Sequence, residues 1–158
     1  MSTVDLSTRR VPPRGGFNLT LLRLEVRRLL RNRRTMLFTV AMPVVFFLIF
    51  GLNAQYAGER AGHGNVSAFI LISMALYGAI LATTTGGAMV SIERAEGWSR
   101  QLRLTPLAPL AYVAVKMITA LVLGGLSVLA VYTAGLISGK PSMPAHLWVL
   151  TALAVWLG

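Results

Sequence analysis

The chain has 158 residues, the length of one ordinary domain, but 55% of them are hydrophobic and only 13% are charged. Soluble domains carry about 25% charged residues, so this composition excludes an ordinary soluble fold and indicates a membrane protein. There is no cysteine, which excludes disulfides, thiolate metal ligands and a cysteine nucleophile. The net charge is +10, and its distribution along the chain is more informative than its total.

The first 34 residues are predicted to form a leader and an amphipathic helix. Residues 1–16 end in a stretch rich in proline and glycine, which favours a disordered leader. Over residues 17–34, leucines and a valine recur at helical spacing on one face. The opposite face carries arginines, namely Arg23, Arg27, Arg31 and Arg34. Such a helix directly before a span is expected to lie in the plane of the lipid headgroups. We interpret it as an elbow helix that packs beside a partner protein, and an ordinary juxtamembrane anchor is the alternative.

Four apolar runs follow, at about residues 35–52, 66–92, 111–137 and 146–158. A membrane-spanning helix needs about 20 residues, with a lower limit of about 17, so each of the first three runs can span. The fourth would reach only about 20 Å at 1.5 Å per residue, which is short of a crossing. We therefore expect the N-terminal part of a longer all-α polytopic membrane protein, in which an interfacial helix precedes a bundle of transmembrane helices.

The basic residues predict the orientation of the chain. Thirteen of the 15 lysines and arginines lie before the first span or in and next to the loop at 93–110, whereas only Arg60 and Lys140 lie in the other two loops. The positive-inside rule therefore places the N-terminus and the 93–110 loop in the cytoplasm, with the spans in the cell membrane. Contact with anionic lipid accounts for the basic N-terminus. Nucleic-acid binding is disfavoured, because this tail is tethered to a span and has a single aromatic residue, Phe17.

Small residues recur at four-residue spacing within the second and third spans. In lipid, such stripes let helix backbones approach closely. The residues predicted to pack in this way are Gly78, Ala82, Gly86, Gly87 and Gly124. A polar path lined by the threonines at 83–85 is the alternative.

The sequence predicts no catalytic, cofactor or metal site. The nearest approach to a phosphate-binding G-x-x-x-x-G-K-[ST] loop, at residues 135–140, has one spacer too few. Two histidines and one aspartate do not assemble a hydrolase triad. No acidic residue or histidine lies in the middle of a span, which argues against a proton relay.

A charged island at residues 93–107 separates an uncharged run of 32 residues from one of 23. Its pattern is Glu93-Arg94-x-x-Gly97, four further residues, and then Leu102-Arg103-x-Thr105-Pro106-Leu107. This pattern, after a second span rich in small residues, resembles the membrane subunit of a type 2 ABC exporter. It is most similar to bacterial permeases associated with drug and antibiotic export.

That resemblance implies six spans per subunit, two permease subunits as a homodimer or heterodimer, and separate cytoplasmic ATPase subunits that bind the ATP. The island would be the coupling helix that docks on the ATPase. The residues implied in this contact are Glu93, Arg94, Gly97, Trp98, Arg100, Leu102, Arg103, Thr105 and Pro106. The expected function is export of a drug, antibiotic or lipid-like substrate. A membrane scaffold or assembly protein that does not transport is the alternative. From the sequence, the default partners of Glu93 and Glu96 are the arginines of the island itself.

Overall fold

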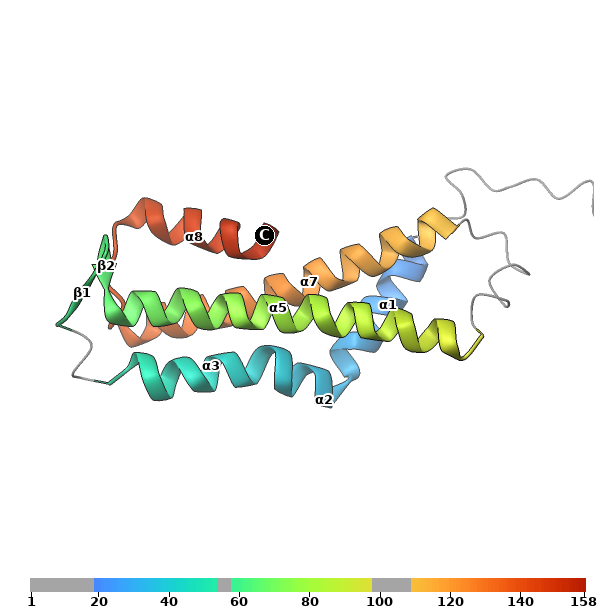
Figure 1. The fold of residues 1–158 in the computed structure, drawn as a ribbon, viewed down its shortest axis with the longest axis horizontal. Helices are drawn as coiled ribbons and strands as arrows, with labels where there is room; N and C mark the ends of the chain where they lie inside the picture. Colours follow the sequence, from blue (N-terminus) through green and yellow to red (C-terminus); the bar gives the residue numbers. More distant parts are fainter. Residues whose placement is uncertain (1–18, 54–57, 98–108) are drawn as a thin grey trace, which may run out of the picture.

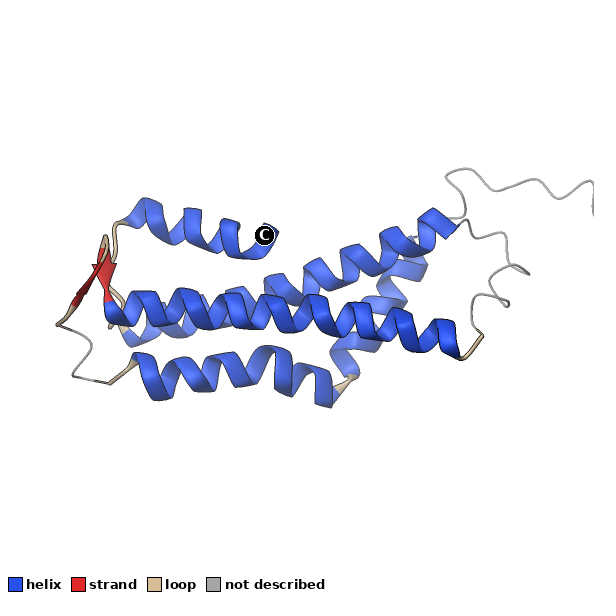
Figure 2. Ribbon diagram, viewed as in Figure 1, coloured by secondary structure: helices blue, strands red, loops and turns tan. Residues whose placement is uncertain are grey.

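The computed structural model describes residues 19–53, 58–97 and 109–158 and confirms an all-α membrane fold. Three helical segments are long and apolar enough to cross a membrane: Arg33–Gly51, Val66–Ala95 and Leu110–Ser138. They run side by side along the long axis of the molecule (Figure 1). Apart from one short antiparallel hairpin, the regular structure is helical (Figure 2). We call the two ends of the bundle the α1 end and the hairpin end.

The predicted amphipathic helix ends three residues earlier than expected, at Arg31 instead of Arg34. Helix α1 covers Leu19–Arg31, and a separate helix α2 covers Arg33–Met36. Between them, Asn32 leaves helical geometry (φ −77°, ψ 93°), and its side chain accepts a hydrogen bond from the Thr35 amide at 3.3 Å. Asparagine is a favoured N-cap because its side-chain oxygen satisfies an amide of the first helical turn. The predicted helix over 17–34 is therefore wrong at its C-terminal end, and Arg34 belongs to the first span.

The first span contains two wide turns. After α2 come η3 (Leu37–Ala41), α3 (Met42–Phe46) and η4 (Phe47–Gly51), where η marks π-helical geometry. Pro43 has no amide hydrogen for the carbonyl of Thr39 four residues earlier. Ser127 of the third span donates to that carbonyl at 2.8 Å. Ser67 likewise donates to the carbonyl of Gly51 at 2.6 Å. Hydroxyls from neighbouring helices thus satisfy backbone groups of an irregular span.

Helices α5 (Val66–Ala95) and α7 (Pro109–Ser138) form the centre of the bundle. Four of the five predicted packing residues lie in or beside their interface. A Cβ on Gly78 would collide with Ser127, one on Gly86 would lie 3.2 Å from the Cβ of Ala120, and one on Gly124 would lie 3.8 Å from that of Ala82. Gly87 differs, because nothing lies within 4 Å of a Cβ built there. Within the described residues, the prediction for Gly87 is therefore not met.

The hairpin end is held by one buried amide. Strands β1 (Arg60–Ala61) and β2 (Gly64–Asn65) pair in the loop between the first two spans, and Gly62 takes a positive φ of 60° at the turn. The Asn65 side chain accepts from the amides of Ala68 and Ser142, both at 2.9 Å, and donates to the carbonyl of Lys140 at 2.8 Å. Asn65 therefore fastens the start of α5 to the loop after α7.

Helix α8 (Ala145–Leu157) turns back from the hairpin end and lies along α5 and α7 (Figure 1). Its side chains bond to α7 at two levels. Tyr132 donates to the Thr151 hydroxyl at 2.8 Å, and the Trp156 indole donates to the carbonyl of Leu121 at the same distance. Gly125 leaves the space for that indole, because a Cβ there would lie 2.8 Å from its nitrogen. This helix of 13 residues matches the fourth apolar run.

Candidate functional site: a charged junction at the α1 end

The predicted coupling residues divide into two groups. Glu93 and Arg94 lie in the last turn of α5, so the helix continues past the expected end of the span at residue 92. Gly97 follows with a φ of 75° and donates its amide to the carbonyl of Arg94 at 3.1 Å, which is a common way for a helix to end. The remaining predicted residues lie outside the described residues: Trp98, Arg100, Leu102, Arg103, Thr105 and Pro106.

Glu93 points into the bundle. Its side chain is only 12% exposed. One carboxylate oxygen binds the Lys116 ammonium at 2.7 Å and lies 3.5 Å from the Arg28 guanidinium, and the other accepts from the Tyr112 hydroxyl. Glu96, in contrast, is exposed at the end of α5. Among the described residues, Glu93 is therefore paired with side chains of α1 and α7.

Glu25 of α1 completes the junction. Its carboxylate binds the same Lys116 ammonium and lies 3.9 Å from Arg28. Lys116 is 12% exposed, so one buried cation holds carboxylates from two different helices. The two acidic and two basic side chains balance in formal charge. Removal of Lys116, the shielded cation that both carboxylates share, would leave uncompensated charges and cost about 3–5 kcal/mol.

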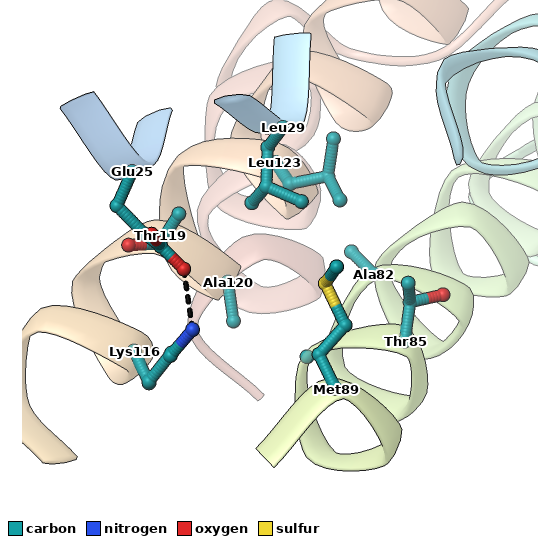
Figure 3. A pocket seen from close by; sticks show the side chains of 10 residues that line it. Glu25, Leu29, Ala82, Thr85, Met89, Lys116, Thr119, Ala120 and Leu123 are labelled. Atoms are coloured by element: carbon teal, nitrogen blue, oxygen red, sulfur yellow. Dashed lines mark hydrogen bonds and ion pairs between the residues drawn. The ribbon is translucent and has the colours of Figure 1, made fainter. Parts of the chain in front are cut away.

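An apolar contact lies directly beside these charges. Leu29 of α1, which is 9% exposed, reaches between α5 and α7. Together with Ala82, Met89 and Leu123 it lines a gap of about 10 Å³ (Figure 3). The figure shows Glu25 of α1 and Lys116 of α7 joined across one side of this gap, with Met89 of α5 on the other. Helix α1 is thus held on α7 by both an ion pair and a leucine.

The arginine face of α1 points outward. Arg23, Arg27 and Arg31 are exposed on α1, and Arg34 is exposed on α2. The opposite face packs against α7 of the same chain. Part of the apolar face predicted to enter lipid is therefore covered by protein, while Leu19, Leu24 and Leu30 remain exposed.

Several residues of the junction are not among the functional residues that the sequence predicts. The sequence pattern includes Arg28 and Lys116 only as two of its basic residues. It gives no signal for Tyr112. Glu25 carried a usable signal, because it lies three residues after Leu22 and four before Leu29 on the apolar face of an otherwise basic helix. Lys116 also has a recognisable sequence signal, because it is a charged residue within the first two turns of an otherwise uncharged helix.

The junction joins side chains of three helices, α1, α5 and α7. The described residues contain no cluster of three histidine, cysteine, aspartate or glutamate side chains that would hold a metal ion. In the same part of the chain, every buried side-chain nitrogen and oxygen has a hydrogen-bond partner. Helices α5 and α7 are connected by residues 98–108, so the junction lies where both helices leave this connection.

Comparison with known proteins identifies the family. Residues 21–158 match the model of the ABC-2 family transporter proteins. The chain is also 30% identical over 138 residues to a Bacillus subtilis protein named "Putative transport permease YvfS". That alignment covers 85% of this chain and 54% of the relative, so the chain spans about half of that protein's length. No solved structure matches. The chain belongs to the ABC-2 transporter family and is a membrane protein.

Proposed function

We propose that this ABC-2 family member is a permease subunit of an ATP-driven exporter, with a separate cytoplasmic ATPase subunit docking on residues 93–107. The observation that carries the proposal is the junction of Glu25, Glu93 and Lys116, which lies where the 98–108 connection meets α5 and α7. A displacement of this connection would be passed to three helices at once, because buried ion pairs and a packed leucine link them.

The other parts of the proposal rest on the family and on the charge pattern. The matched family contains transporters, and the sequence resemblance to drug and antibiotic permeases makes amphiphilic drugs the first substrates to test. A second permease subunit would cover spans that leave large apolar side chains exposed, among them Phe38, Ile49 and Phe50. ATP would bind only to the ATPase subunits.

We propose a cytoplasmic N-terminus from the 13-to-2 asymmetry of basic residues. Gly62 and Ser142 are exposed at the hairpin end, and the sequence has no native cysteine. An impermeant thiol reagent should label Gly62→Cys and Ser142→Cys in intact cells and leave Ser99→Cys unlabelled. The reverse pattern would overturn the orientation.

The docking proposal is tested at Arg103. Its guanidinium suits bidentate pairing with a carboxylate, which lysine does not reproduce. If the contact is desolvated, Arg103→Ala should weaken binding to the ATPase by about 2–5 kcal/mol and reduce export. Arg103→Lys should bind the ATPase little better than Arg103→Ala. Arg60→Ala is the matched control, because it removes one positive charge at the hairpin end. Membrane insertion and complex assembly are measured separately from ATP-driven export. Full export and normal assembly with both Arg103 variants would contradict the proposal.

A further inference from the structure

A second hollow lies beside the junction, on the outer side of α1. Its volume is about 540 Å³, and it lies between α1 and the α5 residue Met89. Arg27, Arg28 and Arg31 line it together with Asn32, the residue that begins the first span. Leu24 and Met89 are among its apolar lining residues. Arg28 also belongs to the junction, whereas Arg27, Arg31 and Asn32 do not.

The hollow has an excess of positive charge. Arg27 and Arg31 are exposed and form no ion pair with any residue that the structure describes. Arg28 forms only long pairs, at 3.5 Å to Glu93 and 3.9 Å to Glu25, and its side chain is 61% exposed. Both carboxylates already bind the Lys116 ammonium closely. Among the described residues, both carboxylates near these three guanidinium groups are already bound to Lys116, so an anion is the complementary ligand.

The lining is also partly apolar, and its position favours one source of that anion. Leu24 is 58% exposed at the hollow, so a ligand with hydrocarbon as well as charge would cover it. The hollow lies where α1 meets the first residues of the apolar Arg33–Gly51 helix. Lipid phosphates occupy this boundary in a bilayer, and clustered arginines there attract anionic lipids. Guanidinium groups pair with phosphate in a bidentate manner.

We propose that this hollow binds one anionic phospholipid, with its phosphate held by Arg27, Arg28 and Arg31 and its acyl chain along Leu24 and Met89. A phosphate on Arg28 would compete with Glu93 for this guanidinium, while Lys116 would continue to neutralise Glu93. Bound lipid would therefore loosen one of the contacts between α1 and α5. The proposal requires only that α1 lies at the lipid headgroups, and it does not depend on export or on the ATPase.

The test measures lipid binding to the full chain purified in an uncharged detergent. The probe is dioctanoyl phosphatidylglycerol, and the comparison ligands are dioctanoyl phosphatidylcholine, glycerol phosphate and inorganic phosphate. We expect phosphatidylglycerol to bind at least about tenfold more tightly than each of the others. Arg27→Gln/Arg31→Gln should weaken its binding by about tenfold or more. Arg23→Gln/Arg34→Gln removes the same two charges outside the hollow and should weaken binding less than about threefold.

Each alternative result overturns the proposal in a different way. Equal weakening by the two double variants would indicate a diffuse surface charge. Equally tight binding of inorganic or glycerol phosphate would indicate an anion site without lipid recognition. Equal binding of phosphatidylcholine, or no binding of phosphatidylglycerol, would exclude recognition of an anionic headgroup. If Arg27→Gln/Arg31→Gln lowers the unfolding temperature without lipid, Arg31→Gln alone must still weaken binding by about threefold, and no change in that variant would reject the site.

Discussion

The two ends of the bundle are fastened by different chemistry. At the hairpin end, one buried neutral amide, Asn65, makes three hydrogen bonds that join backbone groups near residues 68, 140 and 142. At the α1 end, the bonds join charged side chains, and one of these, Arg28, is largely exposed. Backbone groups have fixed positions, whereas long charged side chains can exchange partners. The two ends therefore differ in the groups that their bonds join, and the exposed Arg28 makes the α1 end the one that a charged ligand can reach.

The largest effect is expected at Lys116. Lys116→Met leaves the carboxylates of Glu25 and Glu93 without their shared cation, and we expect a loss of about 3–5 kcal/mol in the free energy of unfolding. Denaturant unfolding in detergent measures it. Lys140→Met at the hairpin end is the matched control and should cost less than about 0.5 kcal/mol, because Lys140 is exposed.

A second variant separates charge from packing at this position. Addition of Glu93→Gln to Lys116→Met should recover part of the lost stability, since it removes one of the two uncompensated charges. Unchanged stability in Lys116→Met, or no recovery in the double variant, would show that the junction does not act through its charges.

The next largest effect is expected at Asn65. Asn65→Ala removes three hydrogen bonds from a side chain that is 7% exposed, and we expect a loss of about 2–3 kcal/mol in the free energy of unfolding. Asn65→Asp retains the acceptor oxygen but not the donor, so it should fall between the wild type and Asn65→Ala. Ser73→Ala is the control, since this exposed hydroxyl bonds only within its own helix. If Asn65→Ala lowers the free energy of unfolding no more than Ser73→Ala does, Asn65 does not stabilise the hairpin end.

The smallest effect is expected at Arg28. Arg28→Gln removes two long pairs of an exposed side chain, so the free energy of unfolding should fall by no more than about 1 kcal/mol. Added salt should abolish the difference in stability between Arg28→Gln and the wild type, because the Debye screening length is only about 3 Å in 1 M salt. The effect of Lys116→Met should persist in salt, as its partners are buried. If Arg28→Gln lowers the free energy of unfolding by much more than about 1 kcal/mol, and salt does not change the effect, the Arg28 side chain is held firmly in the junction.

The sequence predicts the helices better than it predicts the contacts between them. Long uncharged runs mark the spans because a charge within lipid is costly, and the structure contains helices at all four apolar runs. The break at Asn32 was missed because the arginine and leucine periodicity continues to Arg34, although asparagine is itself a capping signal. The wide turns of the first span have only Pro43 as a local sign.

The junction was harder to predict because its partners are far apart in the chain. Glu93 pairs with Lys116, which is 23 residues away, and Glu25 pairs with Lys116, which is 91 residues away. Periodicity identifies the face of a helix but not the helix that it meets. The expected pairing of Glu93 with the arginines of the island used only neighbours in the sequence. Lys116 was instead counted as an orientation signal.

The most direct test of the proposed difference between the two ends is a pair of spin-label distances. They are measured in a complex with the proposed ATPase subunit, with and without ATP. The sequence has no cysteine, so labels can be placed at Arg23 and Ser91 for the α1 end and at His63 and Ser142 for the hairpin end, all of which are exposed. We predict that ATP shifts the distance between residues 23 and 91 and leaves that between residues 63 and 142 unchanged. An unchanged distance at the α1 end, or an equal shift at both ends, would contradict the proposal that the charged junction responds to an ATPase subunit.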